Sequence, residues 1–201
     1  TDGVYVGGRQ TDSGDCSGPK SARNVLAHPH VQAAVLETAR GGMLREGLGF
    51  DKCSVAVVTN IGEGDHLGLN HIHTPEDVAR VKQMIVQNVA PSGHAVLNAA
   101  DEQVVEMAEL CDGAVIFYGV DEHLAAIAAH RQEAGRVVFQ RADRIVLAEG
   151  SVDVATLPLS PLVPPEAVLA AIAAAWALGL TPDLIGAGLR TFEATPKKTH
   201  H

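Results

Sequence analysis

The stretch VLETARGG at residues 35–42 carries the pattern that decides the fold of this 201-residue chain. The apolar run from Ala33 to Leu36 predicts a short buried strand, which ends at the carboxylate of Glu37 and breaks at a glycine pair. In open α/β sheets, ligands bind beyond the carboxyl ends of the strands. The pattern therefore predicts that Glu37 lies where a metal ion or a phosphate group would bind.

A second apolar run, from Val55 to Asn60, is followed by Asp65 and His66. Two parallel strands would bring Glu37 and His66 to the same edge of one sheet. Taken alone, Glu37 also fits a helix-capping residue and His66 an ordinary loop residue, and both alternatives stay open. The two residues together favour a shared site.

Strand-like and helix-like segments alternate along most of the chain. This alternation predicts an α/β fold with a mostly parallel sheet and helices on both faces. Expected strands cover residues 4–6, 33–36, 55–60, 95–98 and 114–118, and expected helices cover residues 17–27, 74–89, 101–110, 123–131, 166–178 and 182–189. Residues 136–160 break the alternation, and we expect a small, peripheral antiparallel β excursion there. One domain is expected over residues 1–192, and residues 193–201 fit a disordered tail or an expression-tag remnant.

Composition excludes several classes of function. The chain has 24 acidic and 15 basic residues, a net charge of −9, which argues against a nucleic-acid or anionic membrane partner. No apolar run approaches the roughly 20 residues that span a bilayer. Cys16, Cys53 and Cys111 are odd in number and widely spaced, which favours reduced thiols in a cytoplasmic protein over a disulfide framework. Cys16 is either a reactive thiol or a small loop residue.

The helix expected from Thr74 carries a lysine on its apolar side. Lys82 comes four residues after Val78 and three before Ile85, so its side chain projects with the apolar stripe. One explanation is that the ammonium group reaches past the stripe into solvent. The other is that burial lowers the lysine pKa and the neutral amine forms a carbamate, whose oxygens suit Mg²⁺. The sequence leaves both open.

Glu37, His66 and Lys82, in this order, resemble the metal site of the central ATPase domain of the Mur ligase superfamily. Within that superfamily, the chain is similar to the Mur-like half of the cyanophycin synthetases. The similar segments cover residues 1–5, 14–19, 37–42, 65–69, 96–99, 169–173, 176–180 and 188–192.

The resemblance implies a P-loop NTPase-like fold in which Glu37 and His66 bind Mg²⁺ and a carbamylated Lys82 supports the metal site. It also implies an ATP-dependent amide ligase, cytoplasmic and homo-oligomeric. Its partners would be ATP, arginine and an aspartate-containing polymer, whose β-carboxylates receive arginine through an acyl phosphate. Arg40 is either a clamp for a carboxylate or phosphate, or a surface residue of the glycine loop. Asn60 and Asn98 are candidate cofactor-binding residues.

The sequence departs from this family in the nucleotide site. It has no Gly-x-x-Gly-Lys-Ser/Thr phosphate loop, which the family carries just before the segment similar to residues 1–5. Ala167 stands near the place of a family asparagine that contacts adenine, and Ala100 replaces an aspartate. The family's N-terminal ATP-grasp half and C-terminal Mur domain are also missing from these residues. We therefore expect an N-terminally truncated piece of a larger ligase, inactive or nearly so alone.

Two other hypotheses stay open. The chain could be a degenerate, non-catalytic Mur-like scaffold or oligomerisation domain, which Ala100 and Ala167 favour. It could also be an unrelated metal-binding domain that uses His66, His71 and His73, although the spacing of the last two is also ordinary for a solvated loop.

Overall fold

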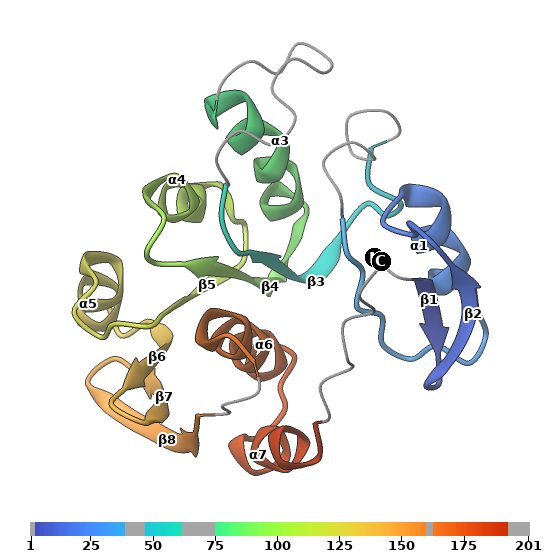
Figure 1. Cartoon of the computed structure of the whole chain (residues 1–201). Helices are drawn as coiled ribbons and strands as arrows, with labels where there is room; N and C mark the ends of the chain where they lie inside the picture. The colour runs from blue at the N-terminus through green and yellow to red at the C-terminus, as the bar shows by residue number, and fades with distance from the viewer. Residues whose placement is uncertain (1–2, 39–46, 62–74, 160–162, 193–201) are drawn as a thin grey trace, which may run out of the picture. The chain divides into compact units, whose positions relative to one another are not determined.

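The computed structural model describes residues 3–38, 47–61, 75–159 and 163–192, and the chain divides into two compact units (Figure 1). The first unit comprises residues 1–53 and 62–88, and the second comprises residues 54–61 and 89–201. Each unit is described by itself below.

The first unit begins with an antiparallel hairpin of β1 (Gly3–Val6) and β2 (Arg9–Ser13). Gly7 and Gly8 form its turn with φ angles of 58° and 80°, which only glycine adopts at no steric cost. The sequence did not predict β2, because every residue of this strand is exposed and polar, so it lacks the alternation of a half-buried strand.

Two helices of this unit match the sequence prediction: α1 (Pro19–Leu26) and α3 (Pro75–Gln87). Proline in the first turn of α1 suits a position where a main-chain N–H would have no helical partner. Gly49 packs against α1 so closely that a Cβ atom there would lie 2.8 Å from the main-chain oxygen of Pro19. Glycine is therefore required at this contact.

The expected buried strand at residues 33–36 is wrong. Residues 27–38 form turns, bends and irregular chain, and Val35 is 98 % exposed. A short apolar run becomes a strand only beside a hydrogen-bonded neighbour, and neither sheet of the described residues includes it. Glu37 therefore does not follow a strand, and the premise that two parallel strands bring Glu37 and His66 together is lost.

The second unit is built on a six-stranded sheet in the order β3-β4-β5-β6-β7-β8. The strands are β3 (Cys53–Val58), β4 (Val89–Asn98), β5 (Ala114–Gly119), β6 (Arg136–Arg141), β7 (Arg144–Glu149) and β8 (Val152–Pro158). β4, β5 and β6 are parallel, whereas β7 and β8 continue the sheet antiparallel. Residues 136–160 are thus not wholly peripheral, because β6 lies between β5 and β7 and completes a β-α-β unit with β5.

Helices cover both faces of this sheet (Figure 1). α6 (Pro165–Ala177) packs on β4, β5 and β6, and α7 (Pro182–Thr191) packs on α6 and β8. The other face carries α4 (Glu102–Glu106), the 3-10 helix η1 (Met107–Leu110) and α5 (Ala125–Gln132). The predicted α/β class is confirmed. Among the helices in the described ranges, none has the length and apolar character needed to cross a membrane.

Alternate residues of the strands supply two cores, as the period of a strand requires. The core under α6 includes Val96, Ile116, Tyr118, Val138, Ile145, Leu147, Leu169, Ile172 and Trp176. The opposite face is anchored by two phenylalanines: Phe117 meets the His130 ring of α5 edge-on at 5.1 Å, and the Arg131 guanidinium lies 5.3 Å from the Phe139 ring.

Candidate functional site

The predicted site residues fall in different parts of the chain. Glu37 and Lys82 belong to the first unit, and Asn60 and Asn98 belong to the second. Arg40 and His66, together with His71 and His73, lie outside the described residues. The convergence of Glu37, His66 and Lys82 therefore stays a prediction.

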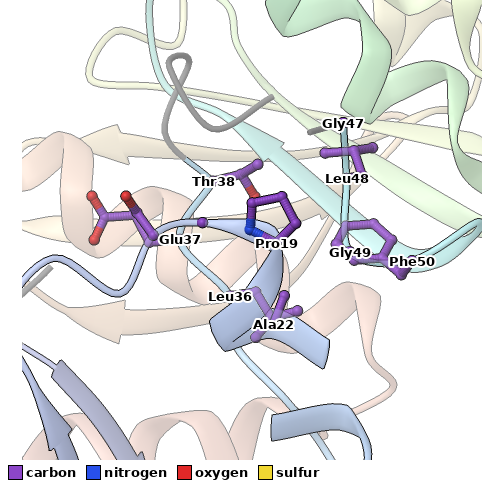
Figure 2. A pocket seen from close by; sticks show the side chains of 11 residues that line it. Pro19, Ala22, Leu36, Glu37, Thr38, Gly47, Leu48, Gly49 and Phe50 are labelled. Carbon is purple, nitrogen blue, oxygen red and sulfur yellow. The ribbon is translucent and has the colours of Figure 1, made fainter. Parts of the chain in front are cut away.

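Glu37 borders a small hollow at the start of α1 (Figure 2). In Figure 2 its carboxylate points away from Pro19 and Phe50, and the side chain is exposed. The hollow is lined by Ser17, Gly18, Pro19, Ala22, Leu36, Glu37, Thr38, Gly47, Leu48, Gly49 and Phe50. Most of these lining residues are apolar, and the negative charge beside the hollow comes from the carboxylate of Glu37.

The segment that enters α1 is fixed by an aspartate. Asp15 Oδ1 accepts hydrogen bonds from the main-chain N–H of Ser17 at 3.1 Å and from its hydroxyl at 2.6 Å. Ser17 is only 7 % exposed, so these bonds satisfy polar groups that water does not reach freely. These bonds therefore hold the turn just before α1, and Ser17 lines the same hollow as Glu37.

The exposed carboxylate of Glu37 is a suitable ligand for Mg²⁺, because this ion prefers oxygen ligands and retains several waters. Within the described residues, no group of three histidine, cysteine, aspartate or glutamate side chains lies close enough to hold a metal ion. The described part of the chain thus supplies at most part of such a ligand set.

Lys82 lies in α3 and is half-buried, between the buried Val78, Val81 and Val86 and the exposed Gln87. The expected apolar stripe is present, although Ile85 is only partly buried and Val89 begins β4 instead of ending the helix. Partial burial is compatible with both explanations of this lysine, since each places its aliphatic stem along the stripe.

Asn98, at the end of β4, uses both ends of its amide in hydrogen bonds to the main chain. Its Nδ2 donates to the main-chain oxygen of Thr59 at 2.8 Å, and its Oδ1 accepts from the N–H of Ala100 at 2.9 Å. The amide thus joins the chain leaving β3 to the end of β4. A direct cofactor contact by Asn98 would have to share these bonds.

Asp101, just beyond Asn98, was not singled out from the sequence. Its Oδ2 accepts a hydrogen bond from the N–H of Ile61 at 2.9 Å. Its Oδ1 accepts from the N–H groups of Gln103 and Val104 at 3.1 and 3.3 Å, which caps α4. An aspartate before a helix signals the cap, whereas the bond to Ile61 has no local sequence pattern.

Tyr118 lies near the end of β5 and is buried under α6. Burial, with a smaller effect from the negative charge of Glu166, raises the pKa of Tyr118 to about 12. Its phenol therefore stays protonated at neutral pH. Ala167 in the first turn of α6 is exposed and offers no side-chain hydrogen bond to a base.

Residues 5–175 match the Mur ligase middle domain family. The chain belongs to this family. It is 40 % identical to the cyanophycin synthetase of Synechocystis sp. over 99 % of its length, and 37 % identical to that of Nostoc sp.. It is also 34 % identical to the UDP-N-acetylmuramate–L-alanine ligase of Xylella fastidiosa over 69 % of its length and 28 % of that ligase.

The chain spans about a quarter of the length of the cyanophycin synthetases, 24 % and 23 % respectively. Among solved structures, MurF from Acinetobacter baumannii aligns with 71 % of the chain and 29 % of MurF, at a TM-score of 0.50 and 21 % identity. This structural similarity supports the fold alone.

Proposed function

We propose that this Mur ligase middle domain is part of an ATP-dependent amide ligase that joins arginine to the β-carboxylates of an aspartate polymer. The observation that carries the proposal is the 40 % identity to a cyanophycin synthetase over 99 % of the chain. The whole reaction would need the remaining parts of a longer ligase.

The proposed reaction has two balanced steps. A carboxylate oxygen of the aspartate side chain attacks the γ-phosphorus of ATP, and the bond to the β,γ-bridging oxygen breaks, giving an acyl phosphate and ADP. The α-amine of arginine then attacks the acyl carbon, the C–O bond to phosphate breaks, and the amine proton passes to a base. One amide, one ADP and one phosphate form for each ATP consumed.

Glu37, His66 and Lys82 would hold Mg²⁺, with Lys82 acting as its carbamate. The ion would neutralise the charge that develops on the transferred phosphoryl oxygens. Arg40 would bind a phosphate or carboxylate with its paired N–H groups. Asn60, exposed just beyond β3, stays a candidate contact for the nucleotide.

Replacing Lys82 in the full-length ligase tests this proposal. Lys82→Ala should abolish ATP-dependent incorporation of labelled arginine while the circular dichroism spectrum stays unchanged. Lys52→Ala, at an exposed lysine of the same unit, serves as the matched control and should retain activity. Near-normal turnover of Lys82→Ala would remove the catalytic role of this lysine.

A non-catalytic scaffold is the second candidate, and Ala100 and Ala167 favour it because neither can hydrogen-bond a nucleotide through its side chain. On that hypothesis, the full-length protein would assemble into oligomers but show no arginine-dependent ADP release. Measuring both quantities on one preparation separates the two functions.

A further inference from the structure

We propose that two copies of this chain associate through the outer side of α7, with the two helices packed antiparallel about a two-fold axis. In such an interface the same surface of each copy contacts the other, so the surface must be complementary to itself. What we call the α7 surface consists of Leu180, Asp183, Leu184, Gly188, Arg190 and Phe192. The proposal depends on neither of the two candidate functions.

Large apolar side chains are exposed on α7 and at both of its ends. Leu184 is 61 % exposed, and Leu180 and Phe192, which flank the helix, are 41 % and 52 % exposed. Of the ten large apolar side chains that are exposed in the described ranges, four lie between residues 178 and 192. A concentration of exposed apolar side chains is typical of a surface that contacts another protein.

The inner side of α7 fixes the direction of this surface. Ile185 is only 6 % exposed, and Gly186 packs so closely on β8 that a Cβ atom there would lie 3.3 Å from Leu157 Cδ2. Figure 1 shows α6 between α7 and the strands β4 and β5. Leu184 therefore points away from the core of the second unit.

The shape of the α7 surface is complementary to itself. Residues four apart lie on the same side of a helix, so Leu184 and Gly188 form one row, which Leu180 and Phe192 extend at its two ends. Gly188 leaves a gap in this row, because a Cβ atom there would meet nothing within 4 Å. When two rows run antiparallel, Leu184 of each copy enters the gap at Gly188 of the other, and Leu180 lies near Phe192. Helices commonly pack with ridges in grooves in this way.

The charges of α7 are complementary in the same arrangement. Asp183 and Arg190 are exposed and lie two helical turns apart, on the same side of the helix. Neither has an ion-pair partner among the described residues. In the antiparallel pair, Asp183 of each copy lies opposite Arg190 of the other. These two are the only charged residues between 178 and 192, so two chains of net charge −9 can approach here with little repulsion.

The association of the 201-residue chain should be weak. One pair of short helices buries less area than the roughly 1,600 Å² of a typical stable interface. We therefore expect a dissociation constant above roughly 10 μM. Sedimentation equilibrium of the chain between 10 μM and 1 mM at low salt covers this range, and the average mass should rise with concentration towards that of two chains.

Charge reversal tests the arrangement, because the two-fold axis makes each change act twice. Asp183→Arg places an arginine opposite Arg190 of the second copy, and Arg190→Asp places an aspartate opposite Asp183. Each variant alone should raise the dissociation constant at least about 10-fold, since like charges then face each other in both contacts. An equimolar mixture of the two variants should associate like the wild type. In the mixed pair, the introduced arginine faces the introduced aspartate, and the native Arg190 faces the native Asp183.

Two further variants complete the test. Leu184→Glu should raise the dissociation constant at least about 10-fold, and circular dichroism should show an unchanged fold. Glu109→Arg reverses an exposed charge of η1, on the opposite face of the sheet, and should associate like the wild type.

A wild type that stays monomeric at 1 mM would overturn the proposal and leave the α7 surface to another partner, such as a different part of a longer ligase. A mixture of Asp183→Arg and Arg190→Asp that stays monomeric would overturn the antiparallel arrangement. Equal loss of association in Glu109→Arg would also overturn it, because the effect would then come from charge reversal anywhere on the surface.

Discussion

Asp153 Oδ2 accepts a hydrogen bond from Arg141 Nη1 at 2.7 Å. Two other residues of the same strand, Ala155 and Leu157 of β8, lie on the opposite face of the sheet and pack in the core under α6. Consecutive residues of β7 pair with Ala155 and Asp153, so Val154 is an extra residue, a β-bulge. The bulge directs Asp153 to the face that carries Arg141, as bulges commonly redirect a side chain.

Removing Arg141 should destabilise the second unit by about 1–2 kcal/mol, because several charge-assisted contacts are lost together. Arg141 pairs with Asp153 and also donates to both carboxylate oxygens of Glu122 at 2.7–3.0 Å, and its guanidinium lies 5.2 Å from the Phe139 ring. Urea denaturation of Arg141→Ala measures this loss in the free energy of unfolding.

In a double-mutant cycle with Asp153→Ala, the coupling energy between the two side chains should be about 0.5–1 kcal/mol and should shrink in 1 M salt. A zero coupling would contradict the pairing.

His94 should make the fold less stable in mild acid. Its Nδ1 is buried without a hydrogen-bond partner among the described residues, and burial, with the nearby charge of Arg136, lowers the pKa of His94. Between the ordinary histidine pKa of about 6.5 and this lowered value, the unfolded chain binds a proton that the folded chain does not. The free energy of unfolding should therefore fall as the pH drops below about 6.5.

Urea titrations between pH 7.5 and 5 test this behaviour. Because the chain contains ten histidines, the useful quantity is the difference between the wild type and His94→Gln. The variant should lose less stability on acidification. The same pH dependence in both proteins would show that His94 titrates normally.

Gly113 should not tolerate a side chain. A Cβ atom at Gly113 would collide with the main-chain oxygen of Gly93, which is not free to move because β4 and β5 are paired. We expect Gly113→Ala to destabilise the chain by about 2–4 kcal/mol. Gly188→Ala is the matched control in α7, where the added methyl group would meet nothing within 4 Å. That change should stabilise the helix by roughly 0.5–1 kcal/mol, measured by thermal denaturation.

The 201-residue chain should bind Mg-ATP weakly or not at all. It has no phosphate loop to surround the β- and γ-phosphates, and Ala167 has no side-chain hydrogen bond for adenine. Isothermal titration calorimetry measures the affinity directly. A dissociation constant at or below roughly 1 μM, about −8 kcal/mol, would mean that other groups bind the phosphates.

The elements with a long, uninterrupted apolar run were predicted from the sequence. The helix α6 and the strand β5 lie where the sequence predicts a helix over residues 166–178 and a strand over residues 114–118, and α7 begins at Pro182 as predicted. The antiparallel β structure within residues 136–160 was also predicted, although its place in the main sheet was not. These elements follow local rules, in which the residue types within one turn or one strand suffice.

The remaining features depend on partners that are distant in the sequence. β2 and β8 are strands because a neighbour pairs with them, although most of their residues are exposed. The run from Ala33 to Leu36 has strand-like composition but no such neighbour in either sheet. The bond from Ile61 to Asp101 joins residues 40 positions apart and depends on the packing of β3 beside β4. The predicted meeting of Glu37 with His66 and Lys82 also depends on distant contacts and stays a prediction.

Within the described part of the chain, β8 ends the six-stranded sheet. A terminal strand with exposed valines, here Val152 and Val154, can pair with strands of other molecules and start aggregation. The bulge at Val154 interrupts the flat row of main-chain groups, Asp153 adds a charge, and Pro158 removes a donor at the end of the strand. The distortion that redirects Asp153 therefore also protects concentrated solutions of the protein against edge-to-edge association.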